Sequence, residues 1–160
     1  MKRTLFYFLL LTSVLVSSQN KNFAVENNLI TWKLVFEDST SVSELRNNPR
    51  LEFVTDSTGY IKKTNFEDKK LNQMTGEFKL ETKKGKYRAS VFNIKFFVEP
   101  MGLYSGGISM QTISEFTIEK SLLKKNGTIK ESSFGYNLTE TLNPNLVELF
   151  TIKRKVKSEW

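Results

Sequence analysis

Apolar and polar residues alternate most regularly between Gly76 and Phe97, where the chain reads GEFKLETKKGKYRASVFNIKFF. A period of two is typical of half-buried β-strands. Lys84-Gly85 divides the segment, and a two-residue loop with glycine second predicts a β-hairpin of Gly76–Lys83 with Lys86–Phe97. The apolar residues of both strands then share one face. The predicted pairs are Phe78 with Val91, Leu80 with Ala89, Glu81 with Arg88, and Thr82 with Tyr87.

Three further segments have the pattern of strands. Leu29–Glu37 alternates most clearly, because four large apolar residues fall on one side: Ile30, Trp32, Leu34 and Phe36. Leu51–Thr55 places Leu51 and Phe53 on one side, and Tyr60–Phe66 alternates more weakly. Trp32 is interpreted as a core residue rather than a ligand platform, because large aromatic residues dominate core burial.

Short polar segments connect these strands. Ser41 and Glu44 fit a capping box, which starts a short helix. This helix ends at Asn47-Asn48-Pro49, because the residue before a proline avoids the α region. Asp56–Gly59 has the composition of a turn, and Glu67–Asn72 is a charged connection into the hairpin.

The second half of the chain favours helices. Gln111–Lys125 is predicted as a helix, because Ile113, Phe116 and Leu123 lie near one stripe. The alternative for its first part is a strand over Thr112–Ile118, since these residues also alternate. Asn143–Val156 is predicted as a second helix, with Asn143 as the N-cap and Pro144 at the first helical position.

The first 18 residues have the pattern of a signal peptide. Lys2 and Arg3 precede the uncharged run Leu5–Val16, and Ser17-Ser18 supplies small residues for cleavage before Gln19. The alternative is a membrane anchor, but a helix of that run would span roughly 18 Å, against about 30 Å of hydrocarbon. We therefore expect cleavage between Ser18 and Gln19 and an exported protein, periplasmic or secreted, with no transmembrane anchor afterwards.

Together these elements predict one α+β domain. Its twisted antiparallel sheet of about five strands carries two main helices packed on one face. The expected organisation is a signal peptide over 1–18, a polar lead over 19–28 and a single domain over 29–160. The mature chain of 142 residues, which is 160 less the 18 of the signal peptide, can bury an adequate core without cross-links.

The composition excludes several chemistries. The chain has no cysteine, which rules out disulfides, thiol nucleophiles and lipid attachment at a cysteine. It also has no histidine, so Ser-His-Asp machinery, His-containing zinc sites and an imidazole pH switch are absent. We expect no metal and no cofactor.

The basic charge is spread along the chain. The formal charge of +7 falls to +5 once Lys2 and Arg3 leave with the signal peptide. Nucleic-acid binders concentrate such charge on one face among aromatic platforms. The lysine groups here fall mostly at turns and ends, which favours a solvated surface and no specific nucleic-acid partner.

Four segments together resemble a known family. They are TWKLVFE at Thr31–Glu37, NNPRLEF at Asn47–Phe53, GKYRASVFNIKF at Gly85–Phe96 and ELFTIKRKVKSEW at Glu148–Trp160. They are similar to small exported proteins of Bacteroidota, related to a domain of unknown function with a TATA-binding-protein-like fold. The resemblance implies an antiparallel sheet with helices on one face. It does not imply DNA binding, because function lies in sites rather than in folds.

No catalytic motif is present. Paired carboxylates would support glycoside hydrolysis, and the candidates lie among lysines that keep them ionised: Glu37-Asp38, Asp56, Glu67-Asp68, Glu77 and Glu81. Gly102–Gly107 lacks the residues of a phosphate-binding loop. We expect a non-catalytic exported binding or envelope-associated module. A small carboxylate-dependent hydrolase acting on extracellular glycans is the alternative.

One stretch offers a localised ligand site. Val98–Ser109 has no periodicity and follows the most strongly specified strand, a common way to present a binding loop. Met101, Leu103 and Tyr104 would supply adaptable apolar surface and one hydroxyl for a small ligand or an envelope protein. The alternative is a plain surface connection.

Overall fold

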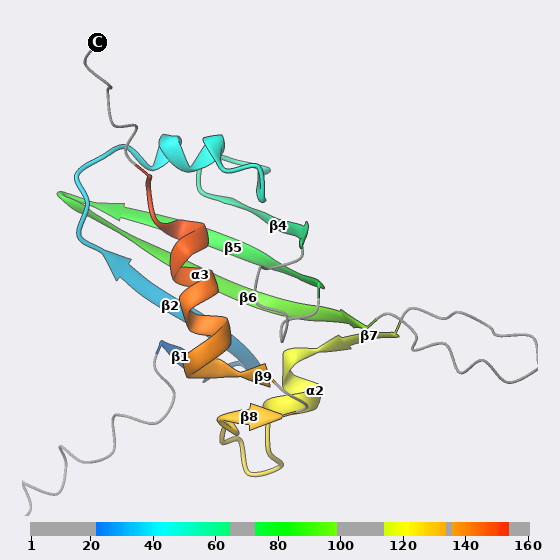
Figure 1. The fold of residues 1–160 in the computed structure, drawn as a ribbon. Coiled ribbons are helices and arrows are strands. Elements are labelled where there is room, and N and C mark those ends of the chain that lie inside the picture. Colours follow the sequence, from blue (N-terminus) through cyan, green and yellow to red (C-terminus); the bar gives the residue numbers. More distant parts are fainter. Residues whose placement is uncertain (1–21, 65–72, 99–113, 134–135, 154–160) are drawn as a thin grey trace, which may run out of the picture.

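The computed structural model describes residues 22–64, 73–98, 114–133 and 136–153 (Figure 1). Two long strands and one helix dominate this part of the chain. In chain order the elements are β1 Phe23–Glu26, β2 Leu29–Phe36, the 3₁₀ helix η1 Val42–Asn47, β3 Leu51–Phe53, β4 Thr58–Thr64, β5 Gln73–Lys83, β6 Lys86–Val98, β7 Ser114–Thr117, α2 Ile118–Leu122, β8 Ser132–Ser133, β9 Tyr136–Asn137, the π-helical turn η2 Leu138–Leu142 and α3 Asn143–Phe150.

The main sheet is antiparallel and has seven strands. Its order is β1-β2-β6-β5-β4-β3, and β7 pairs with β6 off this path. All five predicted strands are present, as β2 to β6, but the predicted number of about five is too low. The additional strands are β1, which falls within the predicted polar lead, and β7.

β1 joins β2 through a two-residue turn. Asn27 and Asn28 form it with φ of 50° and 64°, and Glu26 pairs with Leu29 across it. Two positive φ values at the centre of a two-residue hairpin are typical of a type I′ turn, and asparagine tolerates this conformation.

The β5–β6 hairpin has the predicted register. Phe78 pairs with Val91 and Leu80 with Ala89; the pairs Glu81–Arg88 and Thr82–Tyr87 are also confirmed. Gly85 has a φ of 74°, as the turn requires. The register shifts once, between Thr75 and Glu77. There Asn93, with a φ of 51°, forms a β-bulge in β6.

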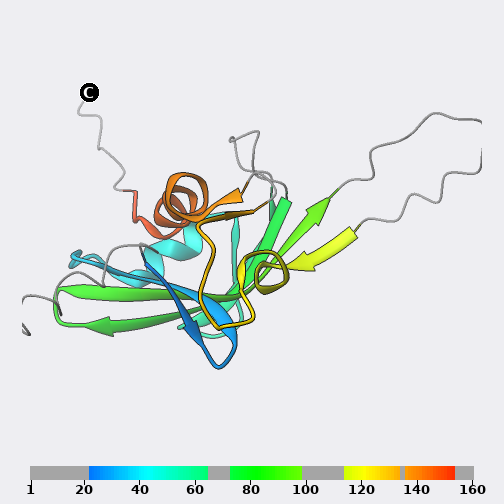
Figure 2. The ribbon, with the colours of Figure 1, turned by 90° about the horizontal axis from the view of Figure 1, so that it is seen from below.

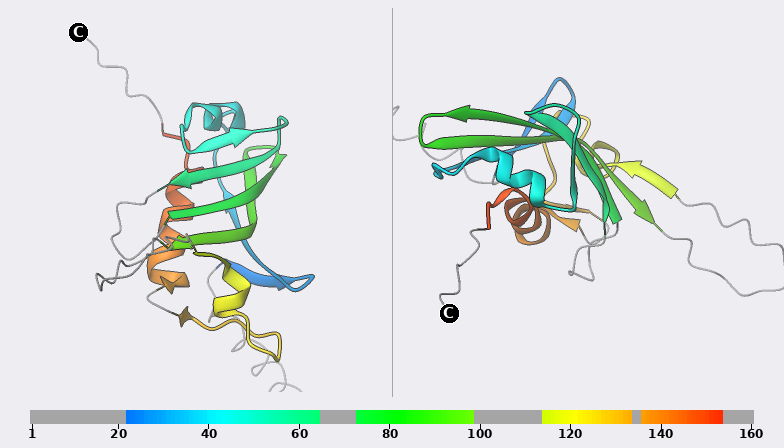
Figure 3. Two further views of the ribbon diagram at one scale, coloured as in Figure 1. Left: turned by 90° about the vertical axis from the view of Figure 1, so that its right-hand side faces the viewer. Right: turned by 90° about the horizontal axis from the view of Figure 1, so that it is seen from above.

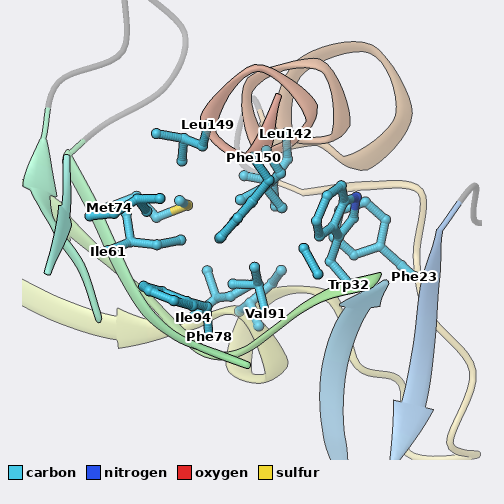
Figure 4. Close-up of a cluster of buried hydrophobic side chains, with 14 of the residues drawn as sticks. Phe23, Trp32, Ile61, Met74, Phe78, Val91, Ile94, Leu142, Leu149 and Phe150 are labelled. Carbon is cyan, nitrogen blue, oxygen red and sulfur yellow. The ribbon is translucent and has the colours of Figure 1, made fainter. Parts of the chain in front are cut away.

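The core lies between the sheet and α3. We call the sheet face that carries Trp32, Phe78, Leu80, Ala89 and Val91 the inner face, and these residues are at most 2% exposed. Figure 4 shows Leu149 and Phe150 of α3 directed at this cluster. The ring of Phe150 lies 5.9 Å from that of Trp32 and 5.4 Å from that of Phe78. Trp32 is thus confirmed as a core residue. α3 and η1 lie on the same side of the sheet (Figures 2 and 3).

α3 starts differently from the prediction. The helical backbone already begins at η2, where Asn137 Oδ1 accepts a hydrogen bond from the N–H of Glu140. Asn143 is therefore not an N-cap. It is buried, and its Oδ1 accepts hydrogen bonds from Trp32 Nε1 at 2.9 Å and Asn22 Nδ2 at 2.8 Å.

α3 also ends earlier than predicted, at Phe150 rather than Val156. The last four carbonyls of a helix have no hydrogen-bond donor within it. In α3 each of these four carbonyls accepts a hydrogen bond from a group outside the helical pattern. The donors are the Thr151 hydroxyl to Val147, the Thr151 N–H to Glu148, Asn48 Nδ2 to Leu149 and the Tyr87 hydroxyl to Phe150. After the helix ends, the chain is no longer helical, but the side chain of Ile152 is still buried.

The predicted helix over 111–125 divides into two elements. Ser114–Thr117 forms β7, so the alternative strand is correct for this part, and residues 111–113 lie outside the described chain. The helix is confirmed only as α2, whose N-cap Thr117 accepts a hydrogen bond from the N–H of Lys120. Glu119 of α2 accepts one from the N–H of Ile30 in β2.

The short helix before β3 has a simpler cap than predicted. Ser41 is the N-cap of η1, but its hydroxyl accepts from the N–H of Ser43, and the Glu44 carboxylate accepts from Asn47 Nδ2. The reciprocal capping box is thus wrong. The predicted end is confirmed, because Asn48 is extended and follows the last residue of η1.

Candidate functional site

Two hollows among the described residues are large enough to consider as ligand sites. The larger, of about 580 Å³, lies between η1 and the end of α3, and we call it the helix hollow. Its polar side chains serve the fold: Asn48 and Thr151 bind carbonyls of α3, and Glu148 pairs with Lys153 at 3.0 Å. The helix hollow therefore gives no argument for a ligand.

The smaller hollow, of about 330 Å³, lies on the other face of the sheet, and we call it the sheet hollow. We call the face that carries Thr31, Lys33, Lys79, Arg88 and Ser90 the open face. Its side chains alternate with those of the inner face along β2, β5 and β6, as the pleat of a sheet requires. Neither α3 nor η1 covers this face (Figure 3).

Two hydroxyl residues form the floor of the sheet hollow. Thr31 is 5% exposed and Ser90 is 6% exposed, although both belong to the open face. Ser90 pairs with Lys33 of β2 on one side and with Lys79 of β5 on the other. The short side chain of Ser90 therefore lies between the long side chains of Lys33 and Lys79, and this difference in length creates the hollow.

Neither hydroxyl has a hydrogen-bond partner among the described residues. Although both residues are mostly buried, their hydroxyl oxygens remain accessible from the hollow. Each hydroxyl can therefore bond to water, or to a ligand that displaces the water.

Charged side chains surround the two hydroxyls in ion pairs. Arg88 Nε donates to Glu81 Oε2 at 2.9 Å, and Lys79 Nζ lies 3.5 Å from Glu81 Oε1. Lys33 pairs with Glu26 in the same way. The hydrogen bond from Arg88, helped by the charges of Arg88 and Lys79 and opposed by burial, holds the pKa of Glu81 below its usual value. Glu81 is thus a carboxylate at neutral pH.

The sheet hollow also has an apolar part. Leu29 and Phe92 line it, and both side chains are partly exposed. Phe92 lies two residues from Ser90 on the same face of β6. The sheet hollow therefore combines free hydroxyls, paired charges and one aromatic side chain.

The site residues predicted from sequence lie elsewhere. Met101, Leu103 and Tyr104 of the predicted ligand loop are outside the described residues, as are Ser18 and Gln19 at the predicted cleavage site. Sequence reasoning did not find Thr31 and Ser90. The available signal was a hydroxyl residue on the solvent side of each of two central strands, with lysines at neighbouring positions.

Three of the predicted carboxylate candidates have ion-pair or hydrogen-bond partners in the structure. Glu37 lies 3.5 Å from Lys86, Asp56 lies 2.7 Å from Arg46, and Glu77 accepts a hydrogen bond from Asn93. Glu67 and Asp68 lie outside the described residues. Within the described ranges there is no group of three or more acidic residues placed to hold a metal ion.

Within the same ranges, no helix has both the length and the apolar character needed to cross a membrane.

The chain was compared with protein families, curated proteins and solved structures. No protein-family model and no curated protein matches the chain. One similar solved structure is the crystal structure of a TBP-like protein from Parabacteroides distasonis at 1.90 Å resolution. The two chains are 13% identical, the match covers 79% of this chain and 94% of that chain, and the TM-score is 0.47.

That protein is called TBP-like, which is also the fold name that the sequence resemblance gave. An identity of 13% and a TM-score of 0.47 are too low to support an argument about topology or function. The fold established here is the mostly antiparallel, seven-stranded sheet with few helices.

Proposed function

We propose that the protein is an exported, non-catalytic binding module and that the sheet hollow is its ligand site. The observation that carries this proposal is a pair of hydroxyls, those of Thr31 and Ser90, that form the floor of the hollow, remain accessible there and have no hydrogen-bond partner among the described residues. Since no protein group engages them, both can donate to and accept from a ligand without breaking a bond of the fold.

The charges of the sheet hollow favour binding over catalysis. A general acid needs a carboxyl group with a raised pKa. The pKa of Glu81 is lowered instead, and Glu26 pairs with Lys33. The cations that line the hollow all lie in ion pairs, in line with our proposal that the protein has no specific nucleic-acid partner.

The site proposal is tested with ¹⁵N-labelled protein and a library of small polar compounds. We expect binders to shift the amide signals of Thr31, Lys33 and Ser90 most strongly. Ser90→Val, which removes one hydroxyl, should weaken these binders. Thr82→Val is the matched control, because Thr82 is an exposed hydroxyl residue on β5 outside the hollow. Shifts that gather elsewhere, or equal binding by both variants, would contradict the proposal.

The export proposal rests on the signal-peptide pattern of residues 1–18 and has its own test. Intact-mass analysis of protein purified from its native host should show loss of Met1 to Ser18 and a terminal Gln19, which cyclises readily to pyroglutamate. Protein that retains Met1 would contradict both the cleavage site and the proposed localisation. Its association with the cell envelope, and its membership of the TATA-binding-protein-like Bacteroidota proteins, are proposals that rest on the sequence resemblance alone.

A further inference from the structure

Resting on the proposed function, we infer that the ligand of the sheet hollow is a neutral carbohydrate. The first reason is the pair of free hydroxyls. Thr31 and Ser90 can each donate one hydrogen bond and accept others. A sugar hydroxyl has the same dual capacity, so it forms a hydrogen bond with either residue whichever one donates.

The second reason is the state of the charges around these hydroxyls. Every charged side chain that lines the sheet hollow is in an ion pair: Lys33 with Glu26, and both Lys79 and Arg88 with Glu81. An anionic ligand would compete with Glu26 or Glu81 for these cations, and a cationic ligand would compete with the cations for the carboxylates. An uncharged hydroxyl adds to the pairs instead, donating to a carboxylate or accepting from a cation without displacing its partner.

The third reason is the aromatic side chain. Phe92 lines the hollow and is partly exposed. A pyranose ring has one face of C–H groups, which packs against an aromatic face while its hydroxyls point to the sides. Polar partners beside an apolar platform therefore suit a sugar better than an ion or an aliphatic chain.

The size of the hollow sets the length of the ligand. About 330 Å³ is at the lower end for small-molecule sites. The hollow is open to solvent rather than enclosed, since it lies on the face that α3 and η1 leave uncovered. It suits one or two sugar rings, whose free ends project outward.

The test is titration of the full mature chain with three classes of sugar. The neutral probes are glucose, galactose, mannose and their common disaccharides; the acidic probe is glucuronate and the basic probe is glucosamine. We expect at least one neutral sugar to bind and to shift the Ser90 amide. We also expect its affinity to change less than about twofold between low and high salt, because no new ion pair forms.

Two variants test the proposed contacts. Ser90→Val should weaken sugar binding by about tenfold, the effect of losing one good hydrogen bond. Phe92→Leu keeps apolar volume but removes the aromatic face, and should also weaken binding. Thr82→Val should bind like the wild type.

The outcomes separate this inference from the proposed function. Preference for glucuronate or glucosamine, with shifts at Ser90, overturns the neutral-carbohydrate inference and leaves the site standing. Binding of other polar compounds at Ser90 but of no sugar does the same. A sugar that binds with shifts away from the hollow, unaffected by Ser90→Val, overturns both. Neutral-sugar binding that both variants weaken supports both.

Discussion

The two faces of the sheet come from the same strands but serve different ends. Leu80 and Glu81 are adjacent, yet Leu80 is 2% exposed beneath α3 while Glu81 pairs with Arg88 on the open face. The inner face consists of large apolar residues that fill one cluster. The open face holds two small polar residues, Thr31 and Ser90, whose hydroxyls have no protein partner among the described residues and remain accessible in the hollow. Burial of apolar surface explains the residues of the inner face, whereas these two hydroxyls add no contact within the described part of the fold.

This difference separates residues needed for the fold from residues available for a ligand. Removal of inner-face contacts should unfold the protein. Removal of open-face groups should leave it folded and change only what it binds. Four measurements test this division, and the first has the largest expected effect.

Leu80→Ala should lower the free energy of unfolding by about 2–5 kcal/mol, because it removes buried methyl groups and leaves a cavity. Glu81→Ala, one residue away, should leave the free energy of unfolding nearly unchanged, because exposed ion pairs contribute little. Urea titration of both variants provides the measurement. Equal losses would mean that the assignment of the two faces is wrong.

Tyr87 gives the inner face a pH dependence at high pH. Burial, followed by the negative charge of Asp38, raises the pKa of Tyr87 to about 12, against a smaller opposing effect of a hydrogen bond with the Ile152 backbone. The unfolded chain loses this proton near pH 10. The stabilisation is therefore complete below pH 10 and is lost as pH rises through 12, by about 2–3 kcal/mol.

Tyr87→Phe is the matched variant for this prediction. Urea titrations of both proteins from pH 9 to 12 should show a steeper loss for the wild type, because lysines and other tyrosines titrate alike in both. Parallel curves would show that the Tyr87 hydroxyl, which donates to the carbonyl of Phe150, is not shielded from solvent.

Asn143→Ala should cost about 1–3 kcal/mol, since it leaves the buried Trp32 Nε1 without an acceptor. Asn145→Ala is the control on the same helix, because Asn145 donates only to the carbonyl of Thr141. Chemical denaturation should give the larger loss for Asn143→Ala. A larger loss for Asn145→Ala than for Asn143→Ala would show that the hydrogen bonds of Asn143 do not hold α3 in place.

Ser90→Val should have the smallest effect on stability, within about 0.5 kcal/mol, because the lost hydroxyl has no protein partner and valine favours strands. Its melting temperature should match that of Thr82→Val. A large destabilisation would show that the Ser90 hydroxyl serves the fold, and the argument for a ligand at the sheet hollow would then fail.

Local patterns predicted the strands better than the helices. The alternation around Leu80 and Arg88, with one glycine turn, defines both the hairpin and its register, because a slip of one residue exchanges the two faces. The start of α3 depends instead on a distant contact. The Asn143-Pro144 pair has the sequence of a helix start, but the amide of Asn143 bonds to Trp32, far away in the chain.

The short elements and the site were harder to predict for related reasons. β1 is four residues long, and only its Asn27-Asn28 turn marks it as part of a hairpin. The sheet hollow depends on which residues stand beside Ser90 on β2 and β5. That depends on strand order, which the sequence pattern left open, so the alternation placed Ser90 on the solvent side without revealing its burial.

The bulge at Asn93 shifts the alternation of β6 by one position. Before it, the odd-numbered residues Tyr87, Ala89 and Val91 are buried; after it, the even-numbered residues Ile94 and Phe96 are buried. Even-numbered residues therefore face outward before the bulge, as Ser90 and Phe92 do, and inward after it. Deletion of this one residue would remove the bulge and leave Val91, Ile94 and Phe96 in one regular alternation, all on the inner face. Among related sequences, a gap at this position should therefore leave the polarity of every following residue in the strand unchanged.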